Sequence, residues 1–194
     1  MMQNLNLQAL LTIPNLLTCF RFVSAPVLLY LAWHGYGNTF LLLLAITFLS
    51  DVLDGIAARM LDQESEFGAL LDSWADLLIY FTIAVSAWWL WPDIVYREKV
   101  YFLMTISSFL LPVVVGIIKF HAFTSYHTWM VKFAVAVMGL SFFLLFLFDF
   151  SLPFRAAAFI CLLAAIEEIA ITCYFSKLHS NVRSIWHVRR DEAL

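Results

Sequence analysis

Four aspartates lie inside strongly apolar stretches of this chain. Asp51 and Asp54 are three residues apart in one stretch, and Asp72 and Asp76 are four residues apart in the next. An ionised carboxylate inside a membrane-spanning segment costs on the order of a few kcal/mol unless it is paired or has a function. Arg59 alone cannot neutralise four acids, whereas one or two divalent cations can. These aspartates are therefore the first candidates for a functional site.

The spacing of the aspartates brings them together if both stretches are helical. Residues three or four apart share one face of a helix, so each pair shares a face. A short turn over residues 61–66 separates the two stretches, which predicts a helical hairpin with both pairs at similar depth. Four carboxylates would then converge, and ligation by oxygen alone suits Mg²⁺, Mn²⁺ or Ca²⁺.

Small residues and one arginine accompany the acids. Gly55, Ala58 and Gly68 each lie within about one helical turn of an aspartate. Small residues let a ligand approach closely, but ordinary helix packing explains the two glycines equally well. Arg59 lies one turn beyond Gly55, where it could bind a phosphate. Metal ions beside a phosphate-binding arginine indicate phosphoryl chemistry.

The elements that must position these residues are membrane spans. Of the 194 residues, 63% are hydrophobic and 13% are charged, and the mean hydropathy is +0.89. A soluble protein of 22.3 kDa could not bury that much apolar surface, so the excess must face lipid. This composition excludes a cytosolic enzyme and a disordered regulator. A net charge of −3 provides no basic field for binding a nucleic acid.

The sequence predicts an all-α integral membrane protein with about six transmembrane helices. We expect a single membrane domain over residues 1–194, in which residues 1–13 form an N-terminal interfacial segment, residues 15–175 the bundle and residues 176–194 a basic cytoplasmic tail. The expected spans are Asn15–His34, Asn38–Met60, Phe67–Trp91, Glu98–Phe120, Trp129–Phe148 and Leu152–Phe175.

Basic residues predict the orientation of the spans. With both termini in the cytoplasm, eight of the lysines and arginines lie at or near the inner face and three at the outer face. The three outer residues are Arg97, Lys99 and Arg155. This orientation places the aspartates near the cytoplasmic surface.

The residues around the aspartates match the signature of a known family, the CDP-alcohol phosphatidyltransferases. The pattern D-x2-D-G-x2-A-R-x8-G-x3-D-x3-D runs from Asp51 to Asp76 without a departure. The first span, with P-N-L-L-T from residue 14 and Arg21 following, also resembles the lipid-synthase members of this family. The specific part of the resemblance is residues 51–76, and beyond the fifth span it is only topological.

The resemblance implies a metal-dependent transfer of a phosphatidyl group. In similar proteins an acceptor hydroxyl attacks the β-phosphorus of a CDP-linked alcohol, and CMP is released. Asp51, Asp54, Asp72 and Asp76 would bind two cations, Mg²⁺ or Mn²⁺, and Asp76 would also take the proton from the hydroxyl. Two cations on a pyrophosphate neutralise the charge of the leaving group and clamp an in-line displacement, so these roles are physically reasonable.

The resemblance also implies a set of residues that hold the CDP group. Gly55 and Ala58 would make room for cytidine, and Arg59 would contact the phosphates. Asn15 and Thr18, about one turn apart in the first span, could supply polar contacts to the nucleotide, or they could cap this span. The candidate CDP-binding residues are Asn15, Thr18, Gly55, Ala58, Arg59 and Gly68.

The acceptor is expected to contact the second half of the chain. Lys119 and Lys132 flank the loop between the fourth and fifth spans and could bind an anionic head group, although the positive-inside bias explains them as well. Glu167 and Glu168 lie in the inner half of the sixth span, where a lone carboxylate is costly. We expect one glutamate to pair with Lys132 and the other to contact the acceptor.

Family resemblance also guides the choice of substrates and assembly. It implies CDP-diacylglycerol as the donor and glycerol 3-phosphate as the acceptor, with inositol phosphate, serine or another alcohol as alternatives. It further implies a homodimer in a bacterial inner membrane with a cytoplasmic active site. Ala134, Ala136 and Gly139 could allow close approach of helices.

Two other classes of membrane protein use aspartates in similar ways. An intramembrane prenyltransferase surrounds Mg²⁺ and a pyrophosphate with aspartates, but on well-separated helices of longer proteins. A divalent-cation transport protein would spread its acids along a pathway from one face of the membrane to the other. The clustering of the four aspartates on one predicted hairpin favours the transferase.

Overall fold

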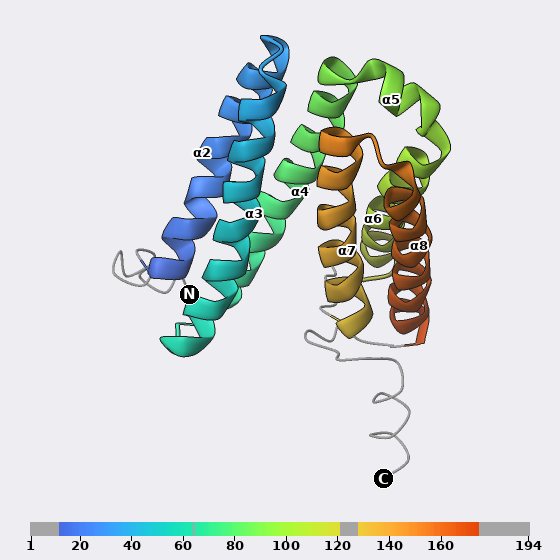
Figure 1. Cartoon of the computed structure of the whole chain (residues 1–194). Helices are drawn as coiled ribbons and strands as arrows, with labels where there is room; N and C mark the ends of the chain where they lie inside the picture. The colour runs from blue at the N-terminus through green and yellow to red at the C-terminus, as the bar shows by residue number, and fades with distance from the viewer. Residues whose placement is uncertain (1–11, 64, 121–127, 175–194) are drawn as a thin grey trace. The chain divides into compact units, whose positions relative to one another are not determined.

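The computed structural model describes residues 12–63, 65–120 and 128–174, and all regular elements among them are α-helices. Apart from the short α5, the helices are long and apolar enough to cross a membrane, which confirms the predicted class and the six expected spans. The expected interfacial segment, apart from Thr12 and Ile13, and the basic tail lie outside the described residues. The helices are α2 (Ile13–Trp33), α3 (Gly37–Met60), α4 (Glu66–Leu90), α5 (Pro92–Arg97), α6 (Lys99–Phe120), α7 (Trp129–Phe148) and α8 (Ser151–Tyr174) (Figure 1).

The helices group into two compact units, residues 1–92 and residues 93–194. In the first unit, α2 packs against both α3 and α4, which pack on α2 far more than on each other. In the second unit, α8 packs against both α6 and α7. The arrangement within each unit can be followed in Figure 1. A single domain over the whole chain therefore stays a prediction.

Small side chains explain why α2 and α8 are the central helices of their units. The buried residues of α2 include Ser24, Ala25 and Ala32, and four alanines are buried on α8. Small residues allow neighbouring backbones to approach closely, which is the main source of attraction between helices in lipid. The side chain of Cys161 also approaches the backbone of α7, with its Sγ 3.8 Å from the carbonyl oxygen of Ala134.

Side-chain caps fix where α2 and α4 begin. Thr12 precedes α2, and its hydroxyl accepts a hydrogen bond from the backbone N–H of Asn15 at 3.4 Å. Ser65 precedes α4, and its hydroxyl accepts a hydrogen bond from the N–H of Gly68 at 3.0 Å. Such caps satisfy N–H groups that have no partner within the helix. They also set the starting register of two helices that carry candidate residues, α2 and α4.

An ion-pair network joins the start of α6 to the turn between α7 and α8. Arg155 donates two hydrogen bonds of 2.8 Å to the carboxylate of Glu98, which is buried just before α6. Arg97 contacts Glu98 at 3.3 Å and also pairs with Asp149, which follows α7. The Arg155 guanidinium holds the pKa of Glu98 below its ordinary value. Two of the three arginine and lysine residues predicted at the outer face are therefore neutralised by neighbouring acids.

We expect Glu98→Gln to destabilise the second unit by about 1–3 kcal/mol, because the buried charge-assisted hydrogen bonds to Arg155 are weakened. The measurement is thermal unfolding in detergent at neutral pH. Asp149→Asn is the matched control, because it removes a carboxylate from the exposed part of the same network and should cost less.

The pH dependence of this difference provides an independent check. Because the pKa of Glu98 is lowered on folding, its stabilisation is fully present above the ordinary carboxyl pKa and is lost as the pH falls through the folded value. The stability difference between the wild-type protein and Glu98→Gln should therefore shrink on acidification. A difference that grows at low pH would contradict this assignment.

Candidate functional site

All four predicted aspartates converge on the guanidinium group of Arg21, which α2 carries between α3 and α4. Nη1 of Arg21 lies 2.6 Å from Asp51 and also contacts Asp76. Nη2 lies 2.6 Å from Asp54 and also contacts Asp72. Arg21 is only 1% exposed. One side chain thus binds two carboxylates of α3 and two of α4.

This contact corrects the expectation that the aspartates have no protein partner. Arg59, the arginine of the motif, is exposed and donates from Nε to the carbonyl oxygen of Gly55 at 2.9 Å. Arg21 lies outside the motif, after the P-N-L-L-T pattern of the first span. Its signal in the sequence is that an arginine in the interior of a predicted span is as costly as an aspartate there. When one predicted span contains an arginine and the next two contain aspartates, the charges are expected to pair with one another.

Three of the four carboxylates form a cluster that could hold a metal ion. Oxygen atoms of Asp51, Asp72 and Asp76 lie within 4.8 Å of one another, and their side chains are about one-third exposed. A partly exposed set of carboxylate oxygens fits Mg²⁺ or Mn²⁺, which also need room for water or substrate oxygens. The donor set therefore suits the predicted cations.

Asp54 has a different environment from the other three acids. Its side chain is only 7% exposed, and Oδ2 accepts a hydrogen bond from the hydroxyl of Thr18 at 3.1 Å in addition to the contact with Arg21. Thr18 also donates to the carbonyl oxygen of Pro14 at 3.1 Å. The N-cap of α2 is Thr12 rather than Asn15 or Thr18. Thr18 therefore positions a predicted metal ligand, a role that the capping alternative did not include.

Gly68 lies where α4 approaches α2 closely. A Cβ atom at Gly68 would lie 3.1 Å from Oδ1 of Asn15 and 3.0 Å from Oγ of Ser65. The packing interpretation thus accounts for Gly68, and the structure brings Gly68 and Asn15 together as two members of the predicted CDP-binding set. A larger side chain at Gly68 would push α4 away from α2. The first turn of α4, which precedes Asp72, would then shift.

Gly55 differs from Gly68 because it faces open space. A Cβ atom at Gly55 would meet no described atom within 4 Å. Close packing against the described residues therefore does not explain this glycine, and the predicted space for a ligand is the remaining interpretation. Ala58, one residue before Arg59, is half-buried on the same helix.

The expected pair between Lys132 and a glutamate is not among the ion pairs of the described residues. Lys132 is exposed on α7, and its ammonium lies 5.7 Å from the centre of the Trp129 ring. Glu167 accepts a hydrogen bond of 3.1 Å from the hydroxyl of Thr128, the N-cap residue of α7. The N-cap side chain of α7 therefore reaches α8, and a pair between Lys132 and a glutamate stays a prediction.

Lys119 has a contact that its position at the end of α6 explains. Its ammonium donates a hydrogen bond of 2.7 Å to the carbonyl oxygen of Cys173, in the last turn of α8. Carbonyl groups in the last turn of a helix have no partner within it, and lysine is a common partner for them. Lys119 thus helps to hold α6 against α8.

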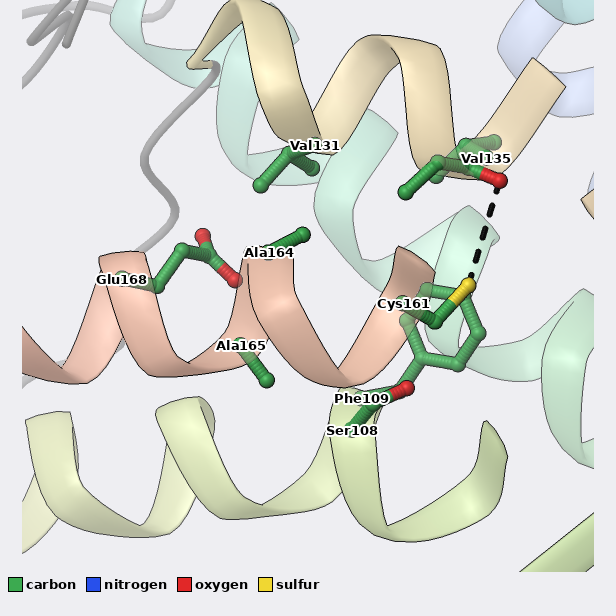
Figure 2. Close-up of a pocket in the computed structure, with 9 residues that line it drawn as sticks. Ser108, Phe109, Val131, Val135, Cys161, Ala164, Ala165 and Glu168 are labelled. Atoms are coloured by element: carbon green, nitrogen blue, oxygen red, sulfur yellow. Dashed lines mark hydrogen bonds between the residues drawn. The ribbon is translucent and has the colours of Figure 1, made fainter. Parts of the chain in front are cut away.

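Glu168 lines a small cavity between α6, α7 and α8 (Figure 2). The cavity has a volume of about 30 Å³, and its other lining residues include Ser108, Val131 and Cys161. This is room for one or two water molecules and not for a lipid head group. In Figure 2 the side chain of Glu168 lies on the same face of α8 as Ala164. An acceptor contact by Glu168 stays a prediction.

Comparison with known proteins gives a family match over most of the chain. The family model described as CDP-alcohol phosphatidyltransferase matches residues 11–174. A cardiolipin synthase (CMP-forming) from Streptomyces coelicolor is 34% identical over 58% of this chain and 54% of its own length. A CDP-diacylglycerol--glycerol-3-phosphate 3-phosphatidyltransferase from Aquifex aeolicus is 35% identical over 39% of this chain and 43% of its own length.

A similar enzyme from Cereibacter sphaeroides, with the same name as the Aquifex aeolicus protein, is 40% identical over 34% of this chain and 31% of its own length. The matched regions thus span from about a third to about half of these relatives. No solved structure gives a significant match to this chain.

The open space at Gly55 leads to a prediction that separates stability from binding. We expect Gly55→Ala to raise the free energy of unfolding by about 0.5–1 kcal/mol, because alanine favours the helix and meets no described neighbour. The same methyl group should weaken binding of CDP by about tenfold or more if cytidine occupies this space. Thermal unfolding in detergent and calorimetric titration with CDP measure the two effects.

Gly68→Ala is the matched control, because its methyl group would press on Asn15 and Ser65. Gly68→Ala should therefore lower the free energy of unfolding, whereas Gly55→Ala should raise it. If Gly55→Ala bound CDP as tightly as the wild-type protein, the space beside Gly55 would not be the nucleotide site.

Proposed function

The chain belongs to the CDP-alcohol phosphatidyltransferase family, and we propose that it transfers the phosphatidyl group of CDP-diacylglycerol to a hydroxyl acceptor with release of CMP. The observation that carries this proposal is the convergence of the four aspartates of the complete family motif around one point. The donor named for the Aquifex aeolicus relative and the CMP-forming reaction named for the Streptomyces coelicolor relative support it.

The proposed reaction is an in-line displacement at phosphorus. The acceptor hydroxyl oxygen forms a bond to the β-phosphorus, and the bond from that phosphorus to the bridging oxygen breaks, so the electron pair leaves with CMP. Asp76 takes the hydroxyl proton. Mg²⁺ or Mn²⁺ held by Asp51, Asp54, Asp72 and Asp76 would neutralise charge on the pyrophosphate and on the leaving CMP.

Residues around the carboxylates would position the donor. We propose that cytidine occupies the open space beside Gly55, next to the half-buried Ala58. Arg59 is exposed one turn further along α3, where its guanidinium can contact the pyrophosphate. Asn15, beside Gly68, would contact the nucleotide from α2. Thr18 and Arg21 hold the acids and would act on the donor only through them.

The proposed acceptor is a hydroxyl of a glycerol phosphate group. Free glycerol 3-phosphate is the first choice, and the two relatives named for this acceptor support it. Phosphatidylglycerol carries the same chemistry, and the Streptomyces coelicolor relative is named for a lipid that contains two phosphatidyl groups on one glycerol. Inositol phosphate and serine remain alternatives for the assay.

We propose that lysines and glutamates in the second half of the sequence contact this anionic acceptor. Lys132 is the better candidate for the phosphate because it is exposed, whereas Lys119 already binds a backbone carbonyl group. Glu167 and Glu168 would contact the acceptor hydroxyl groups. We also propose that the protein functions as a homodimer in a bacterial inner membrane with the aspartates on the cytoplasmic side, as the placement of basic residues indicates.

Purified protein should release CMP from CDP-diacylglycerol in the presence of Mg²⁺ and the correct acceptor. We expect Asp76→Asn to lower this rate by about 10²–10⁴-fold, because the general base and a metal ligand are lost together. Removal of the metal with EDTA should abolish release. Asp93→Asn, which removes an exposed carboxylate far from the motif in sequence, should keep the wild-type rate.

Glycerol 3-phosphate, phosphatidylglycerol, inositol phosphate and serine are offered in separate reactions. Release with one acceptor identifies the product, and glycerol 3-phosphate is the expected one. Equal release by Asp76→Asn, or no release with any acceptor, would contradict the proposal. Metal flux into proteoliposomes without CMP release would instead favour the divalent-cation transport protein.

A further inference from the structure

Arg21 takes the place among the four aspartates that a cation would take. We propose that Arg21 is a built-in counter-ion, which holds these carboxylates together in the metal-free protein and which divalent cations must displace from them. The proposal rests on the metal dependence in the proposed function. It assigns to Arg21 a positioning role, since it acts through the aspartates.

The geometry of the guanidinium group supports the comparison with a cation. Each terminal nitrogen of Arg21 bridges one carboxylate of α3 and one of α4: Nη1 joins Asp51 to Asp76, and Nη2 joins Asp54 to Asp72. Since α3 and α4 pack mainly on α2, this contact is what brings the two halves of the motif together. A planar guanidinium can bridge carboxylates in this way, whereas a lysine ammonium is a single point charge.

The charges explain why such a counter-ion is needed. Four carboxylates close together repel one another, and the apolar surroundings make each of them costly. Arginine keeps its charge in proteins, so it neutralises part of this cluster at any working pH. Without Arg21 the metal-free site would hold four acids with no cation in contact among the described residues.

Arg21 is nevertheless bound incompletely, which favours its exchange for a metal ion. Its Nε is buried and has no hydrogen-bond partner among the described residues. An orphaned buried donor carries a desolvation penalty, so the bound position of the guanidinium is less stable than a fully satisfied one. Three of the four acids are about one-third exposed, which leaves them accessible to a cation.

Competition for the same carboxylates has a measurable consequence. If metal ions bind only when Arg21 has moved, their apparent affinity is the intrinsic affinity multiplied by the small fraction of molecules in which Arg21 has moved. Removing Arg21 therefore raises the affinity for metal ions. It also makes the stability of the protein depend on them, because a ligand that binds only the folded state stabilises it.

The test compares Arg21→Met with the wild-type protein in detergent, with Mn²⁺ as the probe. We expect Mn²⁺ to bind Arg21→Met about tenfold or more tightly than the wild-type protein. In EDTA the variant should unfold at a lower temperature than the wild-type protein, and Mn²⁺ should raise its unfolding temperature by more. Methionine keeps much of the apolar volume of the side chain without its charge.

Arg59→Met is the matched control, because it removes an exposed arginine from α3 that contacts the Gly55 carbonyl and not the aspartates. Its Mn²⁺ affinity should stay within about threefold of the wild-type value, since an exposed charge is screened. An equal gain in Arg59→Met would mean that general charge, and not displacement, sets the affinity, and would overturn the proposal.

Equal or weaker Mn²⁺ binding by Arg21→Met would also overturn the proposal, as would equal unfolding temperatures in EDTA. If Arg21→Met cannot be obtained folded, Arg21→Lys is used, because an ammonium cannot bridge both pairs, and it too should bind Mn²⁺ more tightly than the wild-type protein. Metal-dependent CMP release by the wild-type protein is measured separately. If the wild-type protein releases CMP but loss of Arg21 does not raise the Mn²⁺ affinity, the proposed function stands and the proposed role of Arg21 is wrong.

Discussion

The contact of Arg21 with four aspartates is the interaction on which the first unit depends. Apolar helices in lipid gain little from burying more apolar surface against one another, so a buried polar contact has a large share in deciding which helices meet and in what register. A single arginine on α2 fixes the rotation of α2, α3 and α4 together, because each helix must turn its charged residues toward the same point. Thr18 adds a second contact from the same face of α2.

The two units use different means to hold their helices. In the first unit a charged cluster lies where α3 ends and α4 begins, and Gly68 allows α4 to approach α2 there. In the second unit, small residues on α8 form the centre, and the charges gather around Glu98, near the starts of α6 and α8. The half of the chain with the four clustered aspartates is thus the half with the candidate chemistry.

Much of the fold and part of the site could be predicted from the sequence. Span length and hydropathy are predictable because the bilayer sets the length of a spanning helix and requires apolar side chains on it. The motif spacing predicted that the aspartates of each pair share a helix face. The partner of the acids was missed because an arginine in another helix has no fixed spacing to them. The pairing of Lys132 with a glutamate stays a prediction, since a lysine can extend in several directions and the sequence alone does not define its partner on another helix.

The order of the helices along the chain has a consequence for membrane insertion. The helix with Arg21 is made first, and its partners follow on α3 and α4. An arginine within a span raises the cost of insertion, by up to about 2.5–3.5 kcal/mol at the centre of the span. Until α3 and α4 supply the carboxylates, α2 therefore inserts less favourably than it does with them. Pairing with α3 and α4 lowers this cost, so the three helices favour one another's insertion.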